Sequence, residues 1–445
     1  MRRMKMHFFA ALCGMAIAVT GYSQSVKIKY DEYTLDNGLT VILHEDNSTP
    51  IVTVAVMYHV GSRNEDPERT GFAHFFEHLM FEGSENIERG DYMKIVQDKG
   101  GTLNANTSQD RTYYYQTLPS NQLELGLWLE SERMLHAKVD EEGVETQREV
   151  VKEERRQRYD NQPYGDFMEQ MFSRGFSDHP YRWTPIGSME HLNEASIDEF
   201  RDFYKTFYVP ENAALVITGD FKGKDAKKLI EDYFGTIPQG NGTIPEPEKK
   251  PTTLNGPIVD TVFDNIQLPA VFSSYRIPPN TSEDFYALSM LNTALSGGKS
   301  ARLQKTLADE KEMALQVAGI PLGLQDGGMF IFIGLPNEGV ELTDLEKEIY
   351  NEVEKLKTDL LDEKEFEKIR NQQKSDFVQS NSSTSGIASS LATYNVLYGN
   401  TELINNEIDL YMNVTREDIR RVAKKYLTDQ NRVTLYYLPA DEPVK

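Results

Sequence analysis

Cysteine is almost absent from this sequence: Cys13 is the only one among 445 residues. It lies in an N-terminal segment that we expect to be removed, so disulfide scaffolds and cysteine chemistry are excluded for the mature chain. Basic residues are also few, with 47 Lys and Arg against 70 Asp and Glu. Nucleic acid is therefore not an expected partner, because phosphate binding needs clustered Lys and Arg.

Long apolar runs are missing as well. The apolar stretch 8–19 is too short to span a bilayer comfortably, and no other segment approaches the necessary length. It follows three basic residues and precedes small ones, which is the pattern of a secretory signal peptide over residues 1–23 with cleavage after Ser23. We expect an exported protein without a membrane anchor, located in the periplasm, with full secretion as the alternative.

The net negative charge of the chain affects which peptides it attracts. The formal charge of −23 becomes −26 without the three basic residues of the signal segment. Such a charge favours solubility, and it also favours peptide ligands that carry Lys or Arg.

Proline and glycine gather in one internal stretch, "GTIPQGNGTIPEPEKKPTTLNGPI" at 235–258. Its five prolines exclude a regular helix or a central strand. We predict a linker over 241–258, between an N-terminal domain of residues 24–240 and a C-terminal domain of residues 259–445.

The two halves end alike. "SIDEFRDFYKTFYVPENAALVI" begins at Ser196 and "TREDIRRVAKKYLTDQNRVTLY" at Thr415. Each has a helix N-cap, an acid three residues later, apolar residues at helical spacing, a turn and a β-rich run. The sequence thus predicts a duplicated α+β domain, each copy a mainly antiparallel sheet packed with helices.

The first half shows clear element patterns. "YTLDNGLTVILHED" predicts a hairpin across Asn37-Gly38, and "IVTVAVMYHV" predicts a buried strand. Amphipathic helices are predicted at 121–136 and 141–158.

Candidate metal ligands lie in "TGFAHFFEHLMFEGS". On a helix His74 and His78 project from one face, with Glu77 on the same flank. Two imidazoles at this spacing can chelate zinc while the glutamate takes a proton from a water beside it, as in the inverted motif H-x-x-E-H. The alternative is a core helix with polar residues at its edge, but a buried Glu77 would then need another partner for its charge.

A third ligand is needed. All eight histidines precede residue 192, so the second half offers no imidazole, whereas the acidic segment "VETQREVVKEERRQRYDNQPYG" offers Glu153 and Glu154.

Four segments together resemble the pitrilysin/insulinase-type zinc metallopeptidases, especially the bacterial short members and the subunits of mitochondrial processing peptidase. "GFAHFFEHLMFEGS" is similar to their zinc helix, "REVVKEERR" to their third-ligand helix, "GGTLNANTSQDRTYYY" to their substrate-binding edge strand and "LSGGKSARLQKTLADEKEMALQV" to a second-half motif. The resemblance covers nearly the whole mature sequence.

The resemblance implies an exported zinc endopeptidase that hydrolyses unfolded peptides in an enclosed chamber, with the chain forming one half of a clamshell. It implies that His74, His78 and Glu154 bind one zinc ion per chain, with Glu153 as the rival ligand, and that Glu77 is the general base. A structural or assembly subunit without significant peptidase activity is the alternative, since some relatives of this fold have lost catalysis.

Asn104 would lie in the edge strand that binds substrate, or else is an ordinary hairpin residue. Gln147 stands where members of this family usually have a glutamate, which supports the zinc ligands without binding the metal itself. Arg302 matches an arginine that holds the substrate carbonyl, unless it is a simple surface arginine, but its tyrosine partner is replaced by Leu315. Because a leucine donates no hydrogen bond, the resemblance implies a heterodimer with a sister subunit that lacks the zinc motif, with a homodimer as the alternative.

Overall fold

The computed structural model describes residues 27–240, 242–248 and 254–440. The predicted signal peptide lies outside the described residues. The strands are β1 (Asp31–Thr34), β2 (Thr40–Glu45), β3 (Ile51–Tyr58), β4 (Thr102–Thr107), β5 (Thr112–Pro119), β6 (Ala213–Gly219), β7 (Ile258–Asp264), β8 (Ala270–Ile277), β9 (Ala314–Leu322), β10 (Gly328–Pro336) and β11 (Arg432–Pro439). The helices are α1 (Phe72–Leu79), α2 (Asp91–Asp98), α3 (Leu123–His136), α4 (Glu141–Arg155), α5 (Phe167–Gly175), α6 (Met189–Glu194), α7 (Ile197–Phe207), α8 (Gly223–Phe234), α9 (Glu283–Ser296), α10 (Leu342–Thr358), α11 (Glu363–Ser380), α12 (Thr384–Val396), α13 (Leu403–Asn413) and α14 (Arg416–Tyr426).

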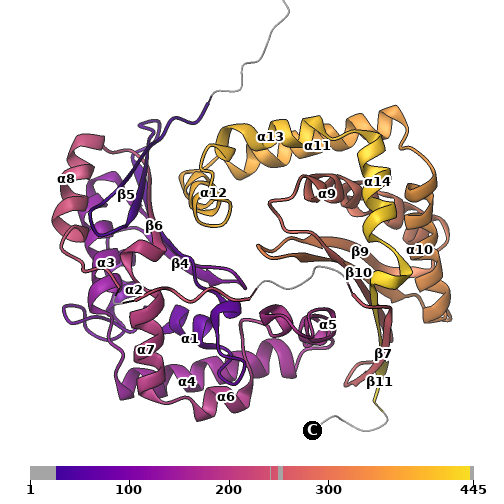
Figure 1. Cartoon of the computed structure of the whole chain (residues 1–445), viewed down its shortest axis with the longest axis horizontal. Helices are drawn as coiled ribbons and strands as arrows, with labels where there is room; N and C mark the ends of the chain where they lie inside the picture. The colour runs from indigo at the N-terminus through magenta and orange to yellow at the C-terminus, as the bar shows by residue number, and fades with distance from the viewer. Residues whose placement is uncertain (1–26, 241, 249–253, 441–445) are drawn as a thin grey trace, which may run out of the picture.

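The strands form two sheets, one in each lobe of the molecule (Figure 1). The first has the order β1-β2-β6-β3-β5-β4 and the second β7-β11-β8-β10-β9. Each contains one parallel pair, β2 with β6 and β7 with β11, and is otherwise antiparallel. The predicted α+β class is confirmed, and so are the β1–β2 hairpin and the buried strand β3.

The similar chain ends form the same structure twice. Ser196 with Glu199, and Thr415 with Asp418, make capping boxes at the starts of α7 and α14. Asn212 then donates to the carbonyl of Phe207 at 2.9 Å, and Asn431 does the same to Tyr426 at 2.9 Å. These short side-chain bonds close the turn into β6 and β11, so the predicted repeat is present in the structure.

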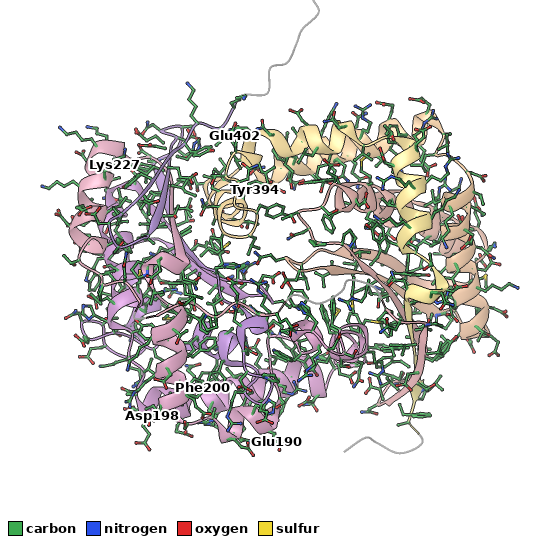
Figure 2. All side chains as sticks on the ribbon, viewed as in Figure 1. Glu190, Asp198, Phe200, Lys227, Tyr394 and Glu402 are labelled. Carbon is green, nitrogen blue, oxygen red and sulfur yellow. The ribbon has the colours of Figure 1, made fainter. Side chains whose placement is uncertain are left out.

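Two helices pack on the sheet of the opposite half. Met171 and Phe172 of α5 pack in one cluster with β8, β10 and β11, while Ile387 and Leu391 of α12 pack with β2, β3 and β6. Figure 1 shows the yellow α12 beside the first sheet and the magenta α5 beside β7 and β11. Tyr394, labelled on α12 in Figure 2, belongs to the same apolar cluster, which covers the first sheet. The strands of the two sheets come from residues 31–219 and 258–439, whereas these two helices each pack on the sheet of the other half.

A buried ion pair and a buried hydrogen bond also join the halves. Arg63, 2% exposed, lies with its Nη1 2.7 Å from Asp326 in the β9–β10 turn. Asp110, in the β4–β5 turn, accepts hydrogen bonds from the Tyr181 hydroxyl at 2.5 Å and the Gln325 amide at 2.9 Å. The second half therefore holds the turn next to β4. Within the described part of the chain, every helix is too short or too polar to cross a membrane.

Candidate metal centre and its surroundings

Helix α1 begins without a side-chain cap of its own. Gly71 adopts φ +99, a left-handed conformation that favours glycine. The backbone N–H groups of Gly71 and Ala73, which have no acceptor within the helix, donate to the buried carboxylate of Glu65, each at 2.9 Å. Burial raises the pKa of Glu65 to about 8. Glu65 was not predicted, because it caps the helix from outside the usual N-cap position.

The apolar residues of α1 form the expected core contacts. Phe72 and Phe75 each lie with their ring centres 4.5 Å from that of Phe200, which Figure 2 labels on α7. Phe76 and Leu79 are fully or nearly fully buried. The helix is thus fixed by its apolar face, and its polar residues are left on the other side.

The polar face meets the end of α4. Helix α4 is capped by Asp140, which accepts from the amide of Gly143. Its last turn places Glu154 Oε2 3.2 Å from His78 Nε2 and 3.6 Å from His74 Nε2, and the two Nε2 atoms are 3.3 Å apart. In the part of the chain that the structure describes, these three residues form the one group of His, Cys, Asp and Glu with converging donor atoms.

The donor set fits zinc. Bonds of about 2.0–2.1 Å in a tetrahedron separate neighbouring donors by about 3.3 Å, close to the distances among these three atoms. Two nitrogens and one oxygen leave a fourth position open, as catalytic zinc sites do. The arrangement suits a divalent cation better than it suits a hydrogen-bond network, because the two Nε2 atoms would compete for one acceptor.

The two acidic candidates differ in placement. Both oxygens of Glu153 are bonded outside the cluster, to Arg156 at 3.2 Å and to Gln157 at 2.9 Å. Glu154 faces the histidines, and its other oxygen pairs with Arg158 at 2.7 Å. The geometry therefore favours Glu154 as the third ligand.

The electrostatics of two of the donors, His74 and Glu154, favour the forms that bind a metal. Burial, with the neighbouring His78, lowers the pKa of His74 to about 4. The hydrogen bond to His78 lowers the pKa of Glu154 to about 2. A neutral imidazole and an ionised carboxylate are the forms that bind a metal.

The side chain of Glu77, on α1, is hydrogen-bonded to β4. Its Oε2 accepts a hydrogen bond from the Thr107 hydroxyl at 2.7 Å. Burial raises the pKa of Glu77, and this hydrogen bond opposes the rise. A carboxylate with a raised pKa beside a metal centre can exchange protons near neutral pH. Thr107 was not predicted, since a threonine within a β-rich run gives no signal of its own.

A cavity of about 240 Å³ opens beside Glu77 and His78. Its other walls are mostly apolar: Phe81, Met93, Gln97, Leu103, Asn104 and Ala105. Asn104 is exposed on β4, which is the edge strand of its sheet, and its Oδ1 accepts from the amide of Ala105. The predicted edge strand is confirmed, and it forms one wall of this cavity.

Gln147 makes its described hydrogen bond outside the three donor residues, so its support of them stays a prediction. Its amide donates to Glu82, which also pairs with Arg89. Arg89 in turn bonds Asp140, the cap of α4. Gln147 thus joins α4 to the segment after α1, and a glutamate there would place a second carboxylate against Glu82.

Arg302 forms an ion pair within the second half. Its Nε and Nη2 bind both oxygens of Glu365 on α11, at 2.9 and 2.7 Å, so the guanidinium is committed to an ion pair within the second half. Leu315 is 61% exposed at an irregular position of β9, the edge strand of the second sheet. The described contacts of Arg302 are thus with Glu365, and its action on a substrate carbonyl stays a prediction.

Comparisons with known proteins identify the family of the chain. Residues 40–183 match the family described as Insulinase (Peptidase family M16), and residues 194–373 match the Peptidase M16 inactive domain. The chain is 33% identical to zinc protease PqqE of Helicobacter pylori over 96% of both chains.

Solved structures resemble the chain over most of its length. A protease from Helicobacter pylori, 33% identical, superposes with a TM-score of 0.89 over 92% of this chain and 99% of that one. The periplasmic protease PqqL from Escherichia coli, 18% identical, has a TM-score of 0.76 over 93% of this chain and 48% of its own. Together with the sequence matches, these likenesses show that the chain belongs to the M16, or insulinase, family of peptidases.

Proposed function

We propose that this protein is an exported zinc endopeptidase that cleaves unfolded peptides. The observation that carries the proposal is the convergence of His74, His78 and Glu154 beside Glu77, at an edge strand. A zinc ion held by the three residues supplies Lewis acidity, which polarises a peptide carbonyl and acidifies a water. Cleavage of an unstructured peptide by the zinc-loaded protein, and its loss with a chelator, test the proposal.

The chain's own residues then have defined tasks. Glu77 accepts a proton from the attacking water and passes it to the leaving amine. β4 offers its free edge to an extended peptide, which adds to the sheet as another strand. The cavity lined by Phe81, Met93 and Leu103 takes an apolar side chain next to the cleaved bond.

Thr107→Val should move the acid limb of the pH–rate profile to higher pH. The Thr107 hydroxyl lowers the pKa of Glu77 against the effect of burial, so its removal raises that pKa. A base with a higher pKa becomes ionised, and hence active, only at higher pH. Profiles of kcat/KM for both proteins measure the shift. An acid limb that stays in place or moves to lower pH would contradict the role given to Thr107.

Peptides that carry Lys or Arg should be cleaved faster than acidic ones of equal length at low salt. The charge of −26 for the chain without residues 1–23 attracts them, and salt screens the attraction. Rates for a matched pair of peptides at two ionic strengths measure the effect. Equal rates at low salt would remove this part of the proposal.

A partner chain is the next part of the proposal. Within one chain Arg302 is bound to Glu365, and Leu315 offers no hydrogen-bond donor. In addition, this chain corresponds to about half the length of PqqL. We infer that the chain works in the periplasm with a zinc-free sister subunit, whose donors reach the substrate carbonyl across the chamber.

The lone chain should accordingly be slow. A missing oxyanion donor costs about 3 kcal/mol in the transition state, or about a hundredfold in rate. Kinetics of the chain alone, with the sister added, and of Leu315→Tyr alone measure this cost. Full activity of the wild-type chain alone, unchanged by the sister, would indicate a homodimer and remove any mechanistic meaning from Leu315.

The alternative is a structural or assembly subunit. The match of residues 194–373 to the Peptidase M16 inactive domain is compatible with this second function. A scaffold has no use for a base beside a metal, so zinc-dependent cleavage that requires Glu77 separates the two functions.

A further inference from the structure

A second pocket, of about 350 Å³, lies where α5 of the first half meets the sheet of the second half. Its walls come from the end of α5, residues 254–258 and Arg276 of β8. None of these belongs to the metal centre or to the cavity beside Glu77. The pocket is therefore a separate feature of the molecule.

Arg276 differs from other buried arginines of the chain. It is only 4% exposed, yet its Nε and Nη2 have no hydrogen-bond partner among the residues that the structure describes. By contrast, Arg63 lies 2.7 Å from Asp326, and Arg133 lies 3.5 Å from Glu130. Arg276 is thus a buried cation without a counter-charge in contact.

Burying the charge of Arg276 without a partner costs free energy of folding. Burial lowers the pKa of Arg276 to about 10 against the opposing charge of Asp178, which forms no ion pair with it among the described residues, so the guanidinium is still charged at neutral pH. Its carbon atom lies 4.3 Å from the ring centre of Phe176, a contact that offsets only part of the lost hydration. A bound anion would supply the missing acceptor.

The surrounding charges select the kind of anion. Arg174, also in the wall, is neutralised by Asp260 at 2.6 Å. Asp178 lines the same pocket, where its charge favours the charged form of Arg276 and repels a dianion more strongly than a monoanion. The Arg276 guanidinium still has Nε and Nη2 without a hydrogen-bond partner among the described residues, and its planar donors match a carboxylate group.

We propose that this pocket binds a monoanionic carboxylate, either the C-terminal carboxylate of a peptide or a free organic acid. The proposal goes beyond peptide hydrolysis and is independent of it, because binding is measured without catalysis.

The test uses the full chain and calorimetric titration with four probes: acetate, N-acetyl-diglycine, its C-terminal amide and chloride. The acid is expected to bind and the amide is not. Arg276→Met should weaken binding of the acid at least tenfold, while Arg182→Met, which removes an equal charge from an exposed arginine outside the pocket walls, should leave it unchanged. Tighter binding of N-acetyl-diglycine than of acetate assigns the site to a peptide terminus, and equal binding assigns it to a free acid.

Thermal stability gives a second measurement. Removing an unpaired buried charge should leave the Tm of Arg276→Met equal to or above that of the wild type, and the acid should raise only the wild-type Tm. The proposal is overturned by unchanged binding in Arg276→Met, by chloride or the amide binding as tightly as the acid, or by no binding of either acid. A Tm well below wild type in Arg276→Met, with no ligand effect on the wild type, would show a purely structural arginine.

Discussion

Glu77→Gln is expected to keep its zinc and to lose peptide hydrolysis by about 10²- to 10⁴-fold. The amide has nearly the shape of the carboxylate and can still accept the Thr107 hydroxyl hydrogen bond, which is 2.7 Å long in the structure. It cannot take a proton from water, however, and it is not one of the three converging donors. Metal analysis and the cleavage rate of a fluorogenic peptide measure the two properties separately.

The control for this variant is Glu88→Gln, which removes the same charge from an exposed residue eleven positions away along the chain. Its rate and its zinc content should equal those of the wild type. A Glu77→Gln rate close to wild type would show that the assigned base is wrong, whereas loss of zinc together with activity would mean that Glu77 belongs to the metal-binding set.

Glu154→Gln is expected to lose zinc altogether in the presence of a competing chelator. Its Oε2 lies 3.2 and 3.6 Å from the two imidazole nitrogens, and a neutral amide is a much poorer zinc ligand than a carboxylate. Hydrolysis should disappear with the metal. Zinc content after dialysis against chelator, followed by titration with zinc, measures the loss of affinity.

Glu153→Gln is the matched control, because it lies one position away on the same helix and bonds only Arg156 and Gln157 among the described residues. It should keep both metal and activity. The reverse result, with zinc kept by Glu154→Gln and lost by Glu153→Gln, would transfer the third ligand to Glu153.

The local parts of this molecule could be predicted from the sequence. The four-residue spacing of His74 and His78 fixes their geometry once α1 is a helix, and the capping boxes at Ser196 and Thr415 depend only on residues three apart. The partners of Gln147 and Arg302 could not be predicted in this way. Both bond to residues more than sixty positions away, which only the tertiary fold brings close.

The supporting residues of the site were missed for a similar reason. Glu65 caps α1 across a loop, and Thr107 reaches Glu77 from a different element. Amphipathic spacing gives α5 an apolar face, whereas the apolar residues of α12 are spread around the helix, and neither pattern shows which sheet the helix covers. Only the structure reveals that each covers the sheet of the other half.

This exchange of helices has a consequence for how the protein folds. If the chain were cut between the halves, the N-terminal fragment would lack α12 over its sheet and the C-terminal fragment would lack α5. Each fragment would expose apolar strands and would be prone to aggregate. The two homologous halves are therefore one cooperative folding unit, and the fragments should reach the native state only when they are produced together.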